Sequence, residues 1–94
     1  MKIEWSDDAL TDLDRFAEFL QERHPSLATI VAEEIIRCVQ VLAEHPLLGQ
    51  PISDRGEYRQ LLMQVLNAPY VFHYRYDGKR VVILRVFHGR ERRK

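Results

Sequence analysis

Residues 81–94 read VVILRVFHGRERRK, and this stretch decides the fold because it joins an apolar strand to a charged end. Four consecutive apolar residues, 81–84, are compatible with a soluble chain only if other elements cover them. The arginines and lysine that follow, together with Arg85, require water or an anion. The stretch therefore predicts a strand that runs from a hydrophobic core to a cationic rim.

The size and composition are those of one globular domain, residues 1–94. Of the 94 residues, 46% are hydrophobic and 30% are charged, which is typical of a chain with a packed core. The sequence has no apolar run of about 18 residues and no basic segment before an apolar one, so we expect neither a membrane span nor a secretion signal. The expected location is the cytoplasm.

The charged residues are distributed unevenly along the chain, although the net charge is zero. Residues 1–57 contain five basic and twelve acidic side chains, whereas residues 58–94 contain nine basic and two acidic ones, which gives −7 and +7. This asymmetry favours a basic surface that attracts an anionic partner. The alternative is that the two parts neutralise each other across the fold.

Apolar periodicity predicts two helices in the first half of the chain. Ser6 is a suitable N-cap, and apolar residues then recur at helical spacing until Pro25, which disfavours helical geometry at the residue before it. A second helix, capped by Ser26, is expected to continue to Pro46, with apolar side chains on more than one side. The acidic residues of the first helix are expected to face solvent.

The second half shows the alternation of strands. Three strands are predicted at residues 58–66, 70–76 and 79–88, after a first strand at residues 1–5. Asp77-Gly78 is typical of a hairpin turn because glycine accepts a positive φ, but the sequence leaves the loop length and the register open. The order β-α-α-β-β-β predicts an α+β fold, with a helical hairpin packed on a small, mostly antiparallel sheet.

Several kinds of chemistry are not indicated by the sequence. It contains no glycine-rich phosphate-binding loop, no paired cysteines or histidines at metal-ligand spacing, and no nucleophile motif of the hydrolases. We therefore expect neither a metal ion nor a cofactor.

Arginines and aromatic residues are the main functional candidates. The predicted strands and their ends carry five arginines and four tyrosines, a combination suited to binding phosphate, nucleic-acid bases or an acidic peptide. In a regular last strand, Arg85 and Phe87 point to one face while Val86, His88 and Arg90 point to the other. A site that uses both Arg85 and His88 would require a bulge or the strand end.

Three segments carry a resemblance to a known family: LAEHPLLGQPISD at residues 42–54, EYRQLLM at 57–63 and APYVFHYRYDGKRVVILRVFHGR at 68–90. Over nearly the whole chain, the sequence resembles the ParE/RelE superfamily of bacterial toxins. The resemblance implies the toxin of a type II toxin–antitoxin module, in which an antitoxin encoded with the toxin wraps and neutralises it.

Two branches of this superfamily imply different mechanisms. ParE-like toxins inhibit DNA gyrase by binding, whereas RelE-like toxins cut messenger RNA in the ribosome. The segments ILRVFHGR and SDRGEYRQL resemble ParE-like toxins more closely than RelE-like ones, so we expect a gyrase inhibitor without a catalytic site. The alternative is a ribosome-dependent endoribonuclease that uses Arg59, Arg85 and His88, and a further alternative is a partner-binding module that has lost its toxicity.

The resemblance also implies a protein partner. An acidic, largely disordered antitoxin is expected to fold on the basic strands and tail, where a sheet edge supplies backbone hydrogen bonds. Without this cover, the free chain is expected to be prone to form a homodimer or to aggregate. The residues expected to bind the target or the antitoxin are Arg59, Arg75, Arg85, His88, Arg90, Arg92 and Arg93.

Overall fold

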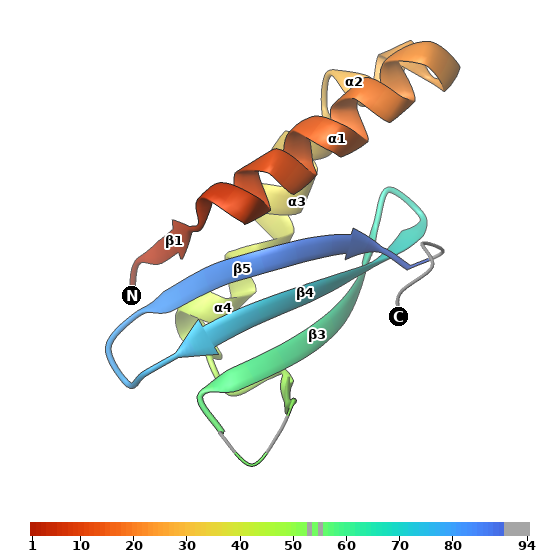
Figure 1. Ribbon diagram of the computed structural model, residues 1–94. Helices are drawn as coiled ribbons and strands as arrows, with labels where there is room; N and C mark the ends of the chain where they lie inside the picture. Colours follow the sequence, from red (N-terminus) through yellow and green to blue (C-terminus); the bar gives the residue numbers. More distant parts are fainter. Residues whose placement is uncertain (53, 55, 90–94) are drawn as a thin grey trace.

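The computed structural model describes residues 1–52, 54 and 56–89, which form a curved sheet with a helical hairpin packed against it (Figure 1). The elements in chain order are β1 (Ile3–Trp5), α1 (Asp7–Arg23), α2 (Pro25–Ala28), α3 (Val31–Val39), α4 (Val41–Glu44), β2 (Gln50–Pro51), β3 (Tyr58–Val65), β4 (Ala68–Tyr76) and β5 (Val81–His88). The predicted α+β fold is therefore confirmed.

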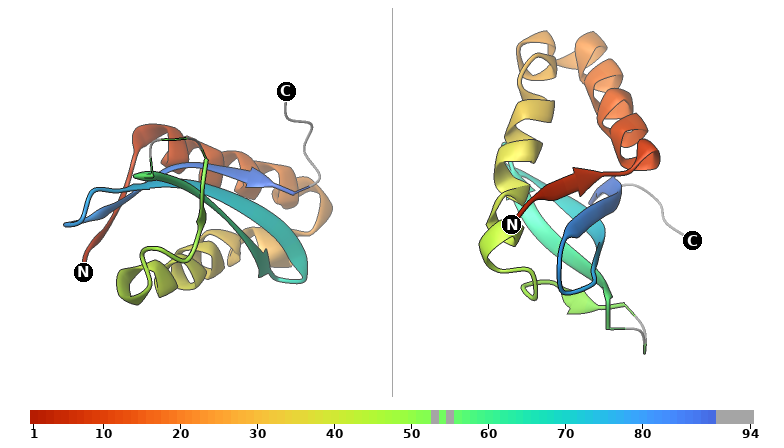
Figure 2. Two further views of the ribbon diagram at one scale, coloured as in Figure 1. Left: turned by 90° about the horizontal axis from the view of Figure 1, so that it is seen from below. Right: turned by 90° about the vertical axis from the view of Figure 1, so that its left-hand side faces the viewer.

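The sheet has the order β1-β5-β4-β3-β2. Only β1 and β5 pair in parallel, and the other neighbours are antiparallel, as predicted. The two-residue strand β2 was not predicted, because a strand that short has no periodicity to detect. α1 packs against β5 and α3 against β3, so the helical hairpin spans the sheet while the opposite face stays open (Figure 2).

The start of α1 is fixed by Ser6, as the sequence predicts. The Ser6 hydroxyl accepts a hydrogen bond from the amide of Ala9 at 3.0 Å, which is the geometry of an N-cap. The same hydroxyl donates to the carbonyl of Leu84 at 2.9 Å, and the Ser6 amide donates to that of Ile83. The cap residue therefore also ties the first turn of the helix to β5.

The second predicted helix is wrong in its continuity and in its cap. It is divided into α2, α3 and α4, and Ser26 lies inside α2 rather than at its N-cap. Three consecutive β-branched residues, 29–31, lower helix propensity at the first break, where the φ of Ile30 is −120°. Ile30 and Ile36 are 37% and 40% exposed, so the apolar surface of this helical segment is not covered on more than one side.

The turn between β3 and β4 is made by two residues with positive φ. Leu66 and Asn67 have φ values of 53° and 67°, as a two-residue type I′ turn requires. The predicted turn at Asn67-Ala68-Pro69 is therefore too late in the chain, because Ala68 and Pro69 already belong to β4.

The predicted hairpin at Asp77-Gly78 is confirmed, and its loop has four residues because Tyr76 pairs with Val81. One carboxylate oxygen of Asp77 accepts hydrogen bonds from the amides of the second and third residues after it. Gly78 has a φ of 95°, a conformation that side chains rarely adopt. This geometry settles the register that the sequence left open.

A bulge in β5 sets which side chains of this strand face the core. Tyr74 pairs with Ile83 but His73 pairs with Arg85, so that Leu84 is the additional residue. Ile83 and Val86 are both fully buried in consequence. Beyond the bulge the alternation is regular, and the predicted separation of Arg85 and Phe87 from Val86 and His88 is confirmed by their contacts described below.

A buried tyrosine attaches the loop between α4 and β2 to the sheet. The Tyr74 hydroxyl donates to the carbonyl of Pro46 at 2.7 Å and accepts from the amide of Gly49 at 2.9 Å. Burial raises the pKa of the Tyr74 phenol, which keeps the proton that it donates. Arg59 also donates to the Gly49 carbonyl, at 2.7 Å. These hydrogen bonds of Tyr74 and Arg59 to the loop are called the latch below.

We expect Gly49→Ala to lower the free energy of unfolding by about 2 kcal/mol, because overpacking at a closed site forces backbone shifts. An added Cβ would lie 2.7 Å from the carbonyl oxygen of Gln60 and 2.8 Å from the Tyr74 hydroxyl. Gly56→Ala is the control, since a Cβ there meets no atom within 4 Å. Urea denaturation measures both variants, and equal stability of the two would contradict this role of Gly49.

Candidate partner-binding surface

A buried carboxylate on α1 organises the edge of the sheet next to the candidate site. Asp12 is only 2% exposed, although its helix was expected to turn its acidic residues to solvent. Its two oxygens accept hydrogen bonds from Arg85 at 2.9 and 3.1 Å and from the amide of Val86 at 2.8 Å. Arg15, one turn further along α1, adds another at 3.1 Å. The expectation that these acidic residues are all exposed is therefore wrong for Asp12.

Asp12 remains ionised because its hydrogen bonds outweigh its burial. Burial raises the pKa of the Asp12 carboxyl, whereas donation from Arg85, the Val86 amide and Arg15 lowers it, and the net pKa lies below the ordinary 3.8. The charge therefore persists at neutral pH. Three of its four hydrogen bonds, those from Arg85 and the Val86 amide, join α1 to β5 beyond residue 83, the last residue of β5 that pairs with β1.

A groove of about 650 Å³ opens between the helices and the end of the sheet. Its wall is mainly apolar, and Phe19 is 54% exposed at its mouth. At its end the ring of Tyr70 makes edge contacts with both Phe16 and His88, at centroid distances of 5.2 and 5.1 Å. The residues that line it come from α1, α2, the start of α3, the turn after β3 and the ends of β3, β4 and β5: Arg15, Phe16, Phe19, Leu20, His24, Leu27, Val31, Val65, Leu66, Ala68, Tyr70 and His88.

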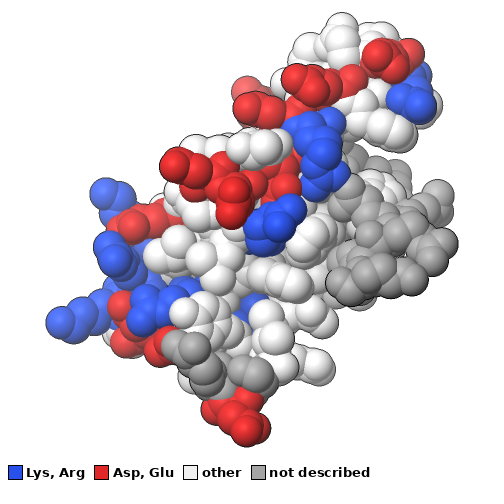
Figure 3. Space-filling view, viewed as in Figure 1, with Lys and Arg blue, Asp and Glu red and all other residues white. Residues whose placement is uncertain are grey.

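Guanidinium groups stack on the aromatic residues of this groove. Arg23 lies 4.0 Å from the ring centre of Phe19, and Arg15 lies 4.8 Å from that of Phe16. In Figure 3, basic side chains lie along the boundary between the acidic α1 and the uncharged surface of the strands. The groove therefore combines an apolar floor with a cationic rim, which suits an amphipathic acidic segment.

The structure does not bring Arg59, Arg85 and His88 together. Arg59 belongs to the latch, Arg85 binds Asp12, and the His88 ring packs on Tyr70. The strand partners of Arg59 and His88 are Tyr74 and Tyr70, four residues apart on β4, which is about 13 Å along a strand. These three residues therefore occupy three separate environments.

Part of the charge asymmetry of the sequence is neutralised by ion pairs within the fold. Arg75 binds Glu57 at 3.3 Å, and Arg80 binds Glu4 at 3.2 Å. With Arg85 on Asp12, three arginines of the second half thus pair with acidic residues of the first half. The alternative that the two halves neutralise each other holds for these three residues.

On the open face of the sheet, aromatic and cationic side chains meet around Phe87. The His73 ring contacts Phe87 edge-on at 5.2 Å, and the Arg85 guanidinium lies 4.9 Å from the centre of the same ring. Gln60 on β3 is hydrogen-bonded to His73. This cluster is the part of the predicted arginine and aromatic surface that the structure assembles on the strands.

Three of the predicted binding residues, Arg90, Arg92 and Arg93, lie outside the described residues. Within the described part of the chain, no cluster of three or more histidine, cysteine or acidic side chains has the geometry to hold a metal ion. A search of the same residues finds no helix that is long and apolar enough to cross a membrane.

Sequence reasoning missed Asp12, Arg15 and the aromatic residues of the groove as candidates. A helical wheel contains a signal for Asp12, because Ala9 and Phe16 lie three residues before it and four after it and are both buried. No comparable signal marks Phe19, whose exposure depends on where the sheet ends.

Comparison with known proteins decides the family. A family model described as the ParE toxin of the type II toxin-antitoxin system parDE matches residues 3–93. The chain belongs to this family. It is accordingly a toxin of a type II toxin–antitoxin module in the ParE/RelE superfamily, as the resemblance implied.

Individual relatives of this ParE-family chain agree with the assignment. It is 33% identical to "Toxin RelE3" of Caulobacter vibrioides over 97% of this chain and 97% of that protein. It is 31% identical to "Putative toxin Y4kP" of Sinorhizobium fredii over 96% of this chain and 90% of that protein. The fold matches a structure described as the chromosomal ParDE TA system from P. aeruginosa, with a TM-score of 0.73 and 24% identity over 94% and 95% of the two chains.

We expect Asp12→Asn to destabilise the protein by about 2 kcal/mol at pH 7, because hydrogen bonds to a charged acceptor are weakened. The pKa of the Asp12 carboxyl in the folded state lies below its ordinary value of 3.8. The carboxylate therefore stabilises the native state at pH values above 3.8, and this stabilisation is lost as the pH falls from there through the folded-state pKa. The difference between Asp12→Asn and the native protein should therefore shrink below about pH 4.

Urea denaturation between pH 7 and pH 3 measures this effect. Asp14→Asn is the matched control, because Asp14 is an exposed acidic residue of the same helix. A difference between Asp12→Asn and the native protein that stays constant over this pH range would contradict the role of the ionised Asp12.

Proposed function

We propose that this ParE-family toxin inhibits DNA gyrase in the cytoplasm by binding it, and that it needs no catalytic residues to do so. The observation that carries the proposal is the separation of Arg59, Arg85 and His88, of which two are engaged in contacts that hold the fold together. Cleavage of RNA requires a general base and a general acid close to one phosphate. A binding inhibitor requires only an accessible surface of suitable shape and charge.

For the gyrase contact, we propose the open face of the sheet together with the basic tail. Phe87 and its neighbours Arg85 and His73 form an aromatic and cationic cluster there, and phenylalanine and arginine are enriched in the cores of protein–protein interfaces. Arg75 lies on the same strands. Arg90, Arg92 and Arg93 extend the positive charge in the sequence.

For the antitoxin, we propose the groove beside α1. An acidic amphipathic segment would place apolar side chains against Phe19 and its neighbours and its carboxylates near Arg15, Arg23 and His88. Such a segment is expected to be disordered when free and to order on binding. The apolar groove would then be covered in the complex.

We expect Phe19→Lys to weaken antitoxin binding by at least tenfold, because it places a charge in the apolar part of the groove, where burying it costs more than about 1.4 kcal/mol. Calorimetric titration with the cognate antitoxin measures the loss. Leu47→Lys is the control, since Leu47 is 61% exposed on the loop after α4. Equal affinity of Phe19→Lys and the native toxin would exclude the groove as the antitoxin site.

Plasmid topology and amino-acid incorporation, followed together in cells after induction, test the proposed target. We expect relaxed or cleaved plasmid DNA while translation continues, because gyrase is the molecule that is blocked. Translation arrest with unchanged topology would instead assign the ribosome and messenger RNA as targets and the RelE-like activity. Normal growth after induction would identify an inactive partner-binding module.

A further inference from the structure

A stretch of β3 is left without a neighbouring strand in the described chain, because the outermost strand β2 is short. Along β5, the edge is covered by β1 as far as residue 83 and then by the Asp12 carboxylate at the Val86 amide. Along β3, the strand β2 pairs with residues 59 and 60 only, and its Pro51 is a residue suited to an outermost strand. Within the part of the chain that the structure describes, residues 61–65 of β3 have no strand on their outer side.

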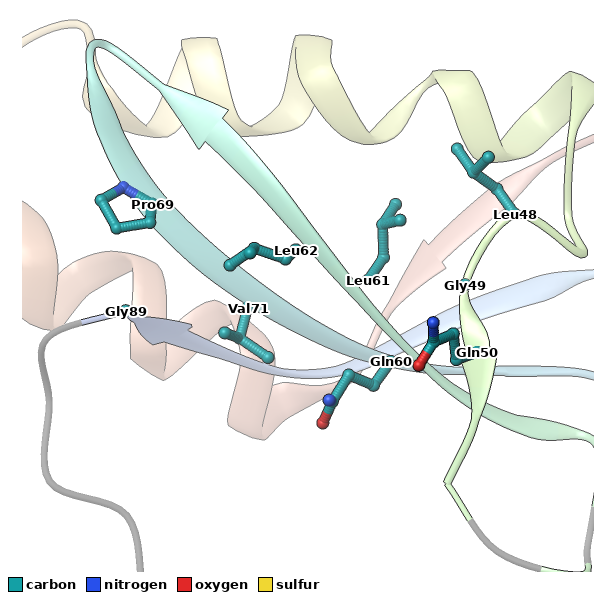
Figure 4. A pocket seen from close by; sticks show the side chains of 9 residues that line it. All are labelled: Leu48, Gly49, Gln50, Gln60, Leu61, Leu62, Pro69, Val71 and Gly89. Carbon is teal, nitrogen blue, oxygen red and sulfur yellow. The ribbon is translucent and has the colours of Figure 1, made fainter.

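This open edge lacks the features that usually protect a sheet edge. Residues 60–65 read QLLMQV, with no charge, proline or glycine, and such six-residue segments pair readily with other strands. Leu62 is 62% exposed, the highest value among the large hydrophobic residues described. In Figure 4, Leu62 lies beside Val71 on the open face, whereas Leu61 points toward the helices. An edge of this kind is expected to have a partner.

The hydrogen-bonding direction of β3 defines how a partner strand would pair. The Ile52 amide donates to the carbonyl of Tyr58 at 2.9 Å, so the backbone groups of Tyr58 point to the outer edge. Because this direction alternates along an antiparallel strand, the amides and carbonyls of Leu62 and Gln64 also point outward. Met63, between them, directs its backbone groups toward β4.

The open edge is complementary to itself around Met63. Two copies related by a two-fold axis at Met63 place Leu62 of each copy opposite Gln64 of the other, which allows about four backbone hydrogen bonds. Leu61 then lies opposite Val65 on the helix-covered side, so apolar side chains meet apolar ones. The pairing uses residues 61–65 and therefore leaves the residues that β2 occupies undisturbed.

We propose that the free toxin forms a homodimer by antiparallel pairing of residues 61–65 of β3 with the same residues of a second copy. Residues 60–65 carry no charge, which favours a second copy of the chain over an acidic segment as the partner. The edge has no cation that would attract carboxylates, and two copies of the edge do not repel each other. Of residues 61–65, only Val65 also lines the arginine-rimmed groove beside α1. The dimer stands independently of the proposed target and of growth inhibition.

Sedimentation of the purified chain over a range of concentrations tests the proposal. We expect reversible dimerisation of the native toxin and at least a tenfold higher dissociation constant for Gln64→Pro, which removes one outward amide from each copy. Gln64 lies opposite Pro69 and its amide points away from β4, so the sheet of the monomer keeps its bonds. Leu62→Lys should have a similar effect, because charges protect edges.

Leu10→Lys is the matched control, since Leu10 is a 46% exposed leucine on α1, which packs against β5 at the other side of the sheet. Circular dichroism confirms that each variant is folded. A native chain that stays monomeric up to millimolar concentration would overturn the proposal. So would a dimer that neither edge variant weakens, or edge variants that weaken only the complex with the antitoxin, which would assign this edge to the antitoxin.

Cysteine cross-linking tests the register. In a Cys38→Ser background, Met63→Cys should form an intermolecular disulfide under mild oxidation, because directly opposed residues at this type of position have Cα atoms about 4.5 Å apart. Leu61→Cys should not, because Leu61 faces Val65 of the other copy. Efficient cross-linking through Leu61→Cys and none through Met63→Cys would overturn the two-fold axis at Met63.

Discussion

The buried carboxylate of Asp12 is the contact on which the arrangement of helices and sheet depends. Strand β1 stops at Trp5, so the next turns of α1 have only side chains with which to hold β5. Asp12 takes the place of the missing strand by accepting from the Val86 amide, and its bonds to Arg85 hold α1 against β5. Because Phe16 and Phe19 follow on the same helix, this contact also determines where the groove opens.

The latch formed by Tyr74 and Arg59 likewise uses side chains to bind backbone groups that have no strand partner. Tyr74 and Arg59 satisfy the backbone of a loop that has no strand partner of its own before β2. An arginine whose hydrogen bonds hold a loop is less available to a phosphate, so its presence in the sequence is weak evidence for catalysis. Arg75 and Arg85 on the strands, and Arg80 in the loop before β5, are likewise paired with carboxylates. These four arginines therefore make contacts within the fold, which leaves them less available for a partner.

How much of the structure could be predicted from the sequence depends on how far apart in the chain the interacting residues lie. The cap at Ser6, the end of α1 before Pro25 and the Asp77-Gly78 loop were predictable because their determinants are neighbours in the chain. Asp12 was not predicted, because two of its partners are 73 and 74 residues away and periodicity assigns a polar residue to solvent. The breaks around α3 were missed because apolar periodicity continues through them.

The edges of the sheet explain why this fold can serve two kinds of protein contact. The outer strands β1 and β2 are short, so parts of β5 and β3 have no neighbouring strand: β5 is closed there by α1 and Asp12, whereas β3 is covered only over the two residues that pair with β2. Contacts that need charge therefore concentrate along α1, and a contact that needs only backbone pairing finds residues 61–65. The groove and the open edge share one residue, Val65 at the end of β3, and the other residues that line the groove lie outside residues 61–65. Antitoxin binding in the groove and self-association at the edge would therefore use largely separate residues, and the two contacts would meet at Val65, the end of β3 that is closest to the helical hairpin.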